Sequence, residues 1–142
     1  MSPPMFVSCA RGGSGGTMLF DTDVLIWVLR GNAKAAKTVD GTDERAVSVV
    51  TYMELLQGAR DQAEVKAIKA FLSDMQFRTI PLTENTGHRA SIYMEEYGLA
   101  VAMGLADALI AATAVEANAA LITGNEKHYK PISELDLKRF RP

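Results

Sequence analysis

Acidic side chains stand beside apolar segments of this sequence, at positions where parallel sheets keep their functional sites. Asp21 follows the apolar run 18–20, Glu54 follows the run 46–50, and Asp107 precedes the run 108–115. Carboxylate oxygens suit Mg²⁺ or Mn²⁺ rather than Zn²⁺, and no Cys/His spacing of a zinc site competes with them. If the three acids meet in the fold, they form a site for a divalent cation.

The elements that would position these acids alternate between strand and helix. Apolar or β-branched runs predict strands at 18–20, 46–50, 77–82 and 120–123, with a last one starting near 135–137, and helical periodicity follows from Val24 and over 32–39, 51–60, 62–75, 83–97 and 106–117. Alternation of this kind is typical of a parallel sheet covered on both faces. We therefore expect an α/β fold, a three-layer α/β/α sandwich with a central parallel sheet.

This topology decides whether the acids meet. Right-handed crossovers place the carboxyl ends of all parallel strands at one edge of the sheet, where open α/β sheets bind ligands. Asp21 follows the first strand, and Glu54 is expected in the first turn of the helix after the second. The helix of Asp107 must begin at the same edge, because it runs down into the strand 120–123. The chain returns there at Asn125, so we expect these side chains to lie together.

Each acid also has a purely structural interpretation. Asp21 and Asp107 could cap a helix or stand in its first turn, which stabilises by about 1 kcal/mol. Thr51-x-x-Glu54 matches a capping box, in which Glu54 reaches back to the start of its own helix. Taken together the capping interpretation weakens, because clustered carboxylates repel one another unless a cation joins them.

Other polar residues are weaker candidates. Asp23 is expected to support the site or cap the helix, Glu126 to be solvated, His88 to be structural and His128 to pack at the surface rather than contact substrate. A serine nucleophile lacks its G-x-S-x-G elbow. The glycines at 12–16 precede the first strand, so they form no dinucleotide fingerprint, and no phosphate-binding P-loop is present.

Composition indicates one globular domain. Of 142 residues, 48% are hydrophobic and 23% charged, and the formal net charge of -2 excludes attraction to nucleic acid by bulk positive charge alone. The single cysteine, Cys9, permits no intrachain disulfide and suits a reducing, cytoplasmic compartment. No uncharged run reaches the roughly 18 residues of a membrane span. Residues 1–17 are expected to be a disordered leader or cloning remnant, and residues 18–142 the folded domain.

Four motifs in order resemble a known family. They are Phe20-Asp21-Thr22-Asp23-Val24-Leu25-Ile26, Thr51-Tyr52-Met53-Glu54-Leu55, Ala106-Asp107-Ala108-Leu109-Ile110-Ala111-Ala112 and Leu121-Ile122-Thr123-Gly124-Asn125. Together they resemble a PIN domain from Met18 to about Pro131. The overall size and the short helical insert are most similar to the VapC-type toxins of bacterial and archaeal toxin–antitoxin pairs.

This resemblance implies a Mg²⁺- or Mn²⁺-dependent endoribonuclease that leaves 5′-phosphate ends. By position, Asp21, Glu54 and Asp107 correspond to the acids that hold the metal, one or two ions, and Asn125 falls where the family has a fourth acid or an Asn. Asp23 stands where the family often has Asn, so it could return the charge that Asn125 lacks. The family further implies a homodimer and a small antitoxin protein that blocks the site.

Four basic residues are candidates to contact the RNA backbone: Arg30, Arg60, Lys127 and Lys130. The basic tail 138–141 is expected to be a solvated end. One alternative is a non-catalytic PIN-like module that binds RNA or protein. The other is a flavodoxin-like receiver phosphorylated at Asp21, which would leave Glu54 and Asp107 unexplained.

Overall fold

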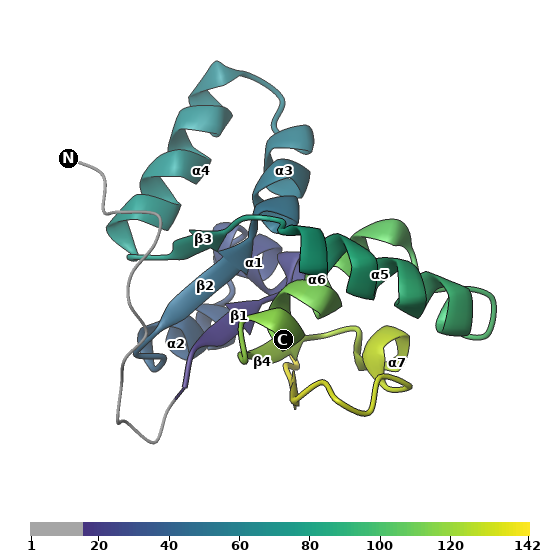
Figure 1. Cartoon of the computed structure of the whole chain (residues 1–142). Coiled ribbons are helices and arrows are strands. Elements are labelled where there is room, and N and C mark those ends of the chain that lie inside the picture. Colours follow the sequence, from purple (N-terminus) through teal and green to yellow (C-terminus); the bar gives the residue numbers. More distant parts are fainter. Residues whose placement is uncertain (1–15) are drawn as a thin grey trace.

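The computed structural model describes residues 16–142 of the chain (Figure 1). Its elements in chain order are β1 (Met18–Phe20), α1 (Thr22–Leu29), α2 (Ala33–Asp40), β2 (Arg45–Ser48), α3 (Val49–Gln57), α4 (Gln62–Asp74), β3 (Arg78–Ile80), α5 (Glu84–Tyr97), α6 (Leu105–Glu116), β4 (Ala120–Thr123), α7 (Glu126–Tyr129) and β5 (Leu137–Arg139). Of the predicted leader, residues 1–15 lie outside the described part of the chain, so that expectation stays a prediction.

The five strands form one parallel sheet in the order β3-β2-β1-β4-β5. Every connection between strands that are consecutive in the sequence contains at least one helix, as the alternation in the sequence predicts. Helices lie on both faces, and α3 and α4 rise from the sheet as a pair (Figure 1). The predicted α/β/α sandwich is confirmed.

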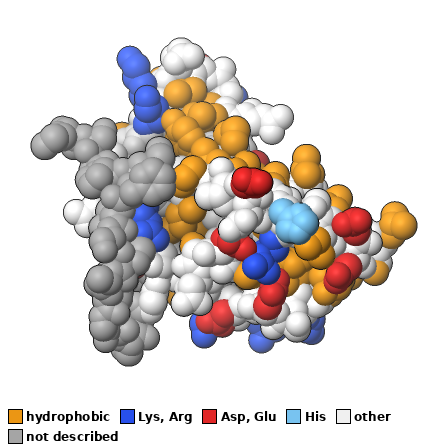
Figure 2. All heavy atoms as spheres, viewed as in Figure 1, with side chains coloured by type: hydrophobic (Ala, Val, Ile, Leu, Met, Phe, Trp, Pro, Cys, Tyr) orange, Lys and Arg blue, Asp and Glu red, His pale blue; other side chains and the backbone are white. Residues whose placement is uncertain are grey.

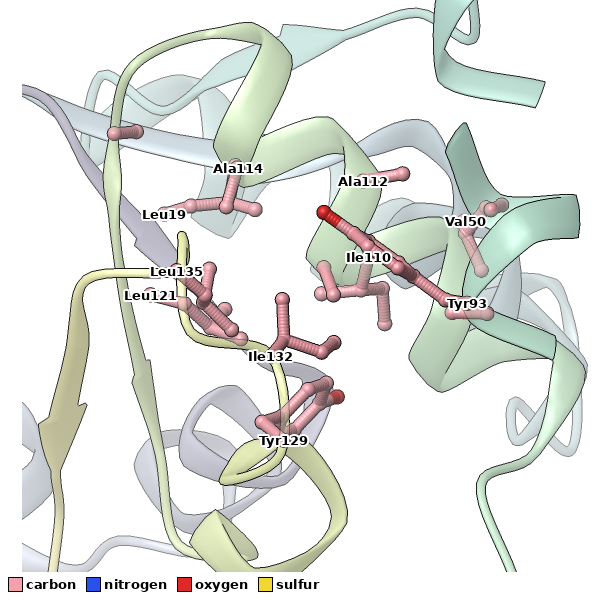
Figure 3. Close-up of a cluster of buried hydrophobic side chains, with 14 of the residues drawn as sticks. Leu19, Val50, Tyr93, Ile110, Ala112, Ala114, Leu121, Tyr129, Ile132 and Leu135 are labelled. Atoms are coloured by element: carbon pink, nitrogen blue, oxygen red, sulfur yellow. The ribbon is translucent and has the colours of Figure 1, made fainter. Parts of the chain in front are cut away.

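Successive side chains of β1 and β4 point to opposite faces of the sheet and so belong to two separate hydrophobic clusters. Leu19 pairs with Leu121 and faces the cluster beneath α5, α6 and α7, whereas Phe20 pairs with Ile122 and faces the cluster beneath α1 to α4. All four side chains are at most 6% exposed. Figure 3 shows the first cluster, which includes Leu19, Leu121 and Ile132. Since both faces of the central strands are buried, their sequences are continuously apolar.

The start of α3 differs from the prediction, and the difference affects the site. The second strand ends at Ser48 rather than at residue 50, and the helix begins at Val49 rather than at Thr51. The Ser48 hydroxyl accepts a hydrogen bond from the amide of Val50 at 3.1 Å, so serine is the N-cap. This cap overrides the β-branched character of the two valines, and it moves Glu54 from the first to the second turn.

Smaller differences occur at the edges of the sheet. The strand predicted at 77–82 is shorter, Arg78–Ile80, and lies at an edge of the sheet, where the proline that follows it, Pro81, is tolerated. The last strand begins at Leu137, at the end of the range 135–137 in which its start was expected. In the described part of the chain, no helix is both long and apolar enough to cross a membrane.

Candidate metal centre

Asp21 stands at the carboxyl end of β1 and is only 5% exposed. Its Oδ1 accepts a hydrogen bond from the amide of Thr22 at 2.8 Å, which makes it the N-cap of α1. Its Oδ2 accepts from the hydroxyl of Thr123 at 2.7 Å and from that of Tyr129 at 3.0 Å. Asp21 therefore caps a helix, as its structural interpretation predicted, and is also held by residues from β4 and α7.

The environment of Asp21 disfavours its charged form. Burial, and next the negative charge of Asp23, raise the pKa of Asp21 from 3.8 to about 7. The hydrogen bonds from Thr123, Thr22 and Tyr129 lower the pKa but do not offset these two effects. No positively charged side chain is among the groups that act on the Asp21 carboxylate, and a bound cation would supply a positive charge there.

Tyr129 joins Asp21 to Asp107. The Tyr129 hydroxyl lies 3.0 Å from Asp21 Oδ2 and 3.2 Å from Asp107 Oδ1, and the side chain is fully buried. Figure 3 shows the Tyr129 ring at one end of the apolar cluster, beside Ile132. Burial, and then the charges of Asp21 and Asp107, raise the pKa of this phenol far above its usual value, so it stays a proton donor. Two acids far apart in the sequence thus share one donor.

Asp107 lies in the first turn of α6. Its Oδ2 accepts a hydrogen bond from the amide of Gly104, the N-cap residue, at 3.1 Å. Nδ1 of His128 lies 3.3 Å from the same oxygen but makes no hydrogen bond of normal geometry. The structural and the functional interpretations of Asp107 are therefore compatible, because Oδ1 points to Tyr129 while Oδ2 serves the helix end.

Glu54 does not form the predicted capping box. Its Oε1 accepts a hydrogen bond from the hydroxyl of Thr22 at 2.5 Å, and the same hydroxyl also contacts Oγ1 of Thr51 at 3.0 Å. Because Ser48 caps α3, Glu54 is free of that role and is fixed to the residue that follows Asp21. Its half-buried side chain lies next to the turn that carries Asp21.

Asp23 of α1 and Asn125, which follows β4, lie on either side of the contact between α1 and the end of β4. Asp23 Oδ2 accepts a hydrogen bond from the amide of Gly124 at 2.9 Å, and Asp23 Oδ1 is buried with no hydrogen-bond partner. Burial is the main cause that raises the pKa of Asp23. The amide of Asn125 donates to Thr123 Oγ1 at 2.9 Å, while its side chain makes no capping hydrogen bond to α7.

These contacts bring the predicted acids to one edge but do not enclose an ion. Among residues 16–142, no three Asp, Glu, His or Cys side chains form a ready set of metal ligands. The donors present nevertheless fit a hard divalent cation. They are carboxylates, burial and the charge of Asp23 raise the pKa of Asp21, and a buried oxygen of Asp23 has no hydrogen-bond partner.

Of the other candidates, His128 lies beside Asp107, whereas Glu126 and His88 fall outside this cluster. Glu126 accepts from Arg139 at 3.1 Å, and His88 is exposed on α5. The sequence interpretation missed Tyr129 and the two threonines that orient the acids. Thr22 and Thr123 lie within the quoted motifs, next to a strand end, which was the available signal. Tyr129 had no such signal, because an aromatic residue near an apolar stretch is usually part of the core.

Replacing Tyr129 with Phe tests this shared donor. The variant keeps the buried ring but leaves two facing carboxylates without their donor, so we expect the metal-free protein to lose about 1–3 kcal/mol of unfolding free energy. Urea unfolding at pH 8 in EDTA measures the loss. The matched control is Tyr97→Phe on α5, expected within about 0.5 kcal/mol of wild type. Equal stability of the two variants would show that the Tyr129 hydroxyl does not hold the acids.

Comparison with known proteins places the chain in a family. The PIN domain family model matches residues 18–132. The ribonuclease VapC10 of Mycobacterium tuberculosis is 36% identical over 122 residues, which cover 83% of this chain and 90% of that protein. The ribonuclease VapC19 of the same organism is 30% identical over 123 residues, covering 82% and 95%.

A solved structure supports the same assignment. A chain of a toxin–antitoxin complex from Klebsiella pneumoniae superposes with a TM-score of 0.72 at 29% identity, covering 84% of this chain and 95% of that chain. The family model spans β1 to α7, the segment that contains every acid described above. The resemblance inferred from the four motifs is therefore confirmed, and the chain belongs to the PIN domain family.

Proposed function

We propose that this protein is a divalent-metal-dependent endoribonuclease and the toxin of a toxin–antitoxin pair. Asp21, Glu54 and Asp107 would hold the ion, with Asn125 beside them. The observation that carries the proposal is the convergence of Asp21 and Asp107 on one buried hydroxyl, with Glu54 fixed to the adjoining turn. The names of the ribonuclease relatives support the substrate class.

The protein's own groups would prepare the site for hydrolysis of an RNA phosphodiester. A bound Mg²⁺ or Mn²⁺ supplies Lewis-acid chemistry, neutralising phosphate charge and lowering the pKa of water. Thr123 and the amide of Thr22 orient Asp21, the amide of Gly104 orients Asp107, and the Thr22 hydroxyl orients Glu54. Such hydrogen bonds fix the ligand oxygens before the substrate arrives.

Basic side chains near the site would contact the RNA backbone. Arg30, Lys127 and Lys130 are exposed and stand on the helices or turns that follow β1 and β4. Arg60 is a weaker candidate than the sequence suggested, because it pairs with Glu64 at 2.7 Å. With a net charge of -2, binding relies on these local charges and on the ion rather than on bulk attraction.

A groove beside the site suits the proposed antitoxin. It is lined by residues of α1, α3 and α4, among them Ile26, Leu29, Leu55, Ile68 and Glu54. On the face seen in Figure 2, hydrophobic side chains gather over α3 and α4. A partner helix with an apolar face would fill such a groove and, because Glu54 lies in its wall, would block access to the acids.

A second apolar surface suits the proposed homodimer. Met53, Leu82 and Leu105 are 50%, 40% and 67% exposed and line one hollow with Val50 and Leu109. Large exposed apolar side chains gathered in this way mark protein–protein contacts. Glu54 also lines this hollow, so a dimer formed here would place two sites near one another. A cytoplasmic location, where RNA and antitoxin are both present, fits the proposal.

Glu54→Gln tests the nuclease directly. Because the amide keeps an acceptor for the Thr22 hydroxyl but loses the charge, we expect Mn²⁺-dependent cleavage of RNA to fall at least about tenfold with little change in melting temperature. Purified wild type and variant are compared on a defined RNA in Mn²⁺ and in EDTA, with 5′-end mapping of the products.

The outcomes separate the candidate functions. A large fall in melting temperature would restore a structural role for Glu54. RNA binding without cleavage by the wild type in Mn²⁺ would favour the non-catalytic module, and growth arrest on expression without a partner would support the toxin.

A further inference from the structure

Asp23 holds an unusual position in the described part of the chain. Its Oδ2 accepts a hydrogen bond from the amide of Gly124 at 2.9 Å, which ties α1 to the end of β4. Its Oδ1 is buried and has no hydrogen-bond partner, and no ion pair among the described residues includes Asp23. Buried carboxylate oxygens in folded proteins are paired, hydrogen-bonded or bound to an ion.

Helix capping accounts for this side chain only in part, because the backbone amides of Val24 and of Asp23 itself oppose the rise of its pKa without making Asp23 the N-cap. The N-cap of α1 is Asp21, and the amide of Val24 already donates to the carbonyl of Asp21 at 3.2 Å. Asp23 lies close enough to Asp21 and Asp107 for their charges to act on one another. Negative charges this close repel one another, so a cation between them would stabilise the folded protein.

Gly124 makes room for this carboxylate. A Cβ on residue 124 would stand 2.6 Å from Asp23 Oδ2, a distance that side chains do not reach without displacement. The absence of a side chain therefore lets the carboxylate approach the end of β4. The next residue, Asn125, brings a neutral amide to that end, whereas Asp23 brings a negative charge to it from α1.

We propose that Asp23 Oδ1 is a further ligand of the divalent cation, and that Asp23 supplies the charge that Asn125 does not. The inference rests on the proposed metal-dependent function. It adds a fourth carboxylate to Asp21, Glu54 and Asp107, and it accounts for both the unpartnered oxygen and the glycine beside it.

Mn²⁺ binding to the full chain, measured by isothermal titration calorimetry after removal of metal with EDTA, tests the proposal without any activity assay. Asp23→Asn keeps an acceptor for the Gly124 amide but loses the charge, and we expect its Kd for Mn²⁺ to rise at least about tenfold. Asp43→Asn, an exposed acid at the opposite edge of the sheet with the same change of charge, should bind within about twofold of wild type.

A second variant separates position from charge. Gly124→Ala leaves every charge in place but pushes Asp23 Oδ2 away, so its Kd should also rise at least about tenfold. Melting temperatures in EDTA check folding, and Asp23→Asn should melt at or above the wild-type temperature because an uncompensated charge is removed.

The outcomes distinguish the two proposals. Wild-type affinity in Asp23→Asn would overturn the role of Asp23 alone, as would a clearly lower melting temperature of that variant in EDTA. Failure of the wild type to bind Mn²⁺ would overturn the proposed metal-dependent function as well.

Discussion

Replacing Asp21 with Asn is expected to reduce Mn²⁺-dependent RNA cleavage at least about 100-fold, more than the 10- to 100-fold typical of groups that only orient a ligand. The amide keeps the shape of the side chain and an acceptor for the Thr22 amide. It cannot keep both donors on the other side, because the hydroxyls of Thr123 and Tyr129 both face Oδ2, which becomes an NH₂ group in one orientation. The variant therefore loses the charge and the alignment of the proposed metal ligand.

Cleavage of a defined RNA at several Mn²⁺ concentrations measures this loss. Asp43→Asn is the matched control and should cleave as the wild type does, since its side chain is exposed at the far edge of the sheet. If Asp21→Asn cleaved within about tenfold of wild type, Asp21 would be a helix cap rather than part of a catalytic centre.

The positions of the acids followed from the sequence because few physical rules determine them. Continuous apolar runs at 18–20 and 120–123 predict central parallel strands, and right-handed crossovers bring their carboxyl ends to one edge. Asp21 and Asp107 needed no further information, since one follows a strand and the other opens a helix. Local ambiguity of one or two residues in the element boundaries did not move either of them away from that edge.

The start of α3 could not be read in the same way. Val49 and Val50 favour strand by propensity, and Thr51 with Glu54 matches a capping box, so two local signals agreed on the wrong boundary. The hydroxyl of Ser48 decided between them, because it caps the helix where β2 ends. The error concealed the actual partner of Glu54, Thr22, which comes from a different helix.

Tyr129 could not be found from sequence because its role depends on tertiary contacts alone. It lies in a four-residue helix that gives no periodic pattern, and its ring is fully buried as a core residue would be. Only the fold reveals that its hydroxyl lies between Asp21 and Asp107. The site is thus predictable where it depends on strand ends and unpredictable where it depends on side chains that cross between elements.

The raised pKa of Asp21 leads to the second large effect, on the stability of the metal-free protein. The folded protein holds the Asp21 proton up to a pH of about 7, whereas the unfolded chain releases it near the ordinary pKa of 3.8. Between these values the folded state binds more protons, so the free energy of unfolding should fall as pH rises from about 4 to about 7 and then level off. The expected fall is about 2–4 kcal/mol.

Urea unfolding between pH 4 and pH 8 in EDTA measures this fall, and two comparisons assign it. Asp21→Asn should lose most of the pH dependence. A smaller dependence should remain, because the raised pKa of Asp23 acts in the same direction. Saturating Mn²⁺ at pH 8 should restore the stability of the wild type, since an ion that binds only the folded state stabilises it, and should restore little in the variant. Stability of the wild type that rises steadily with pH in EDTA would contradict the burial of an uncompensated carboxylate, because paired acids give that slope. The same buried charge therefore connects both predictions: it destabilises the protein without metal, and it is the reason that a cation would bind.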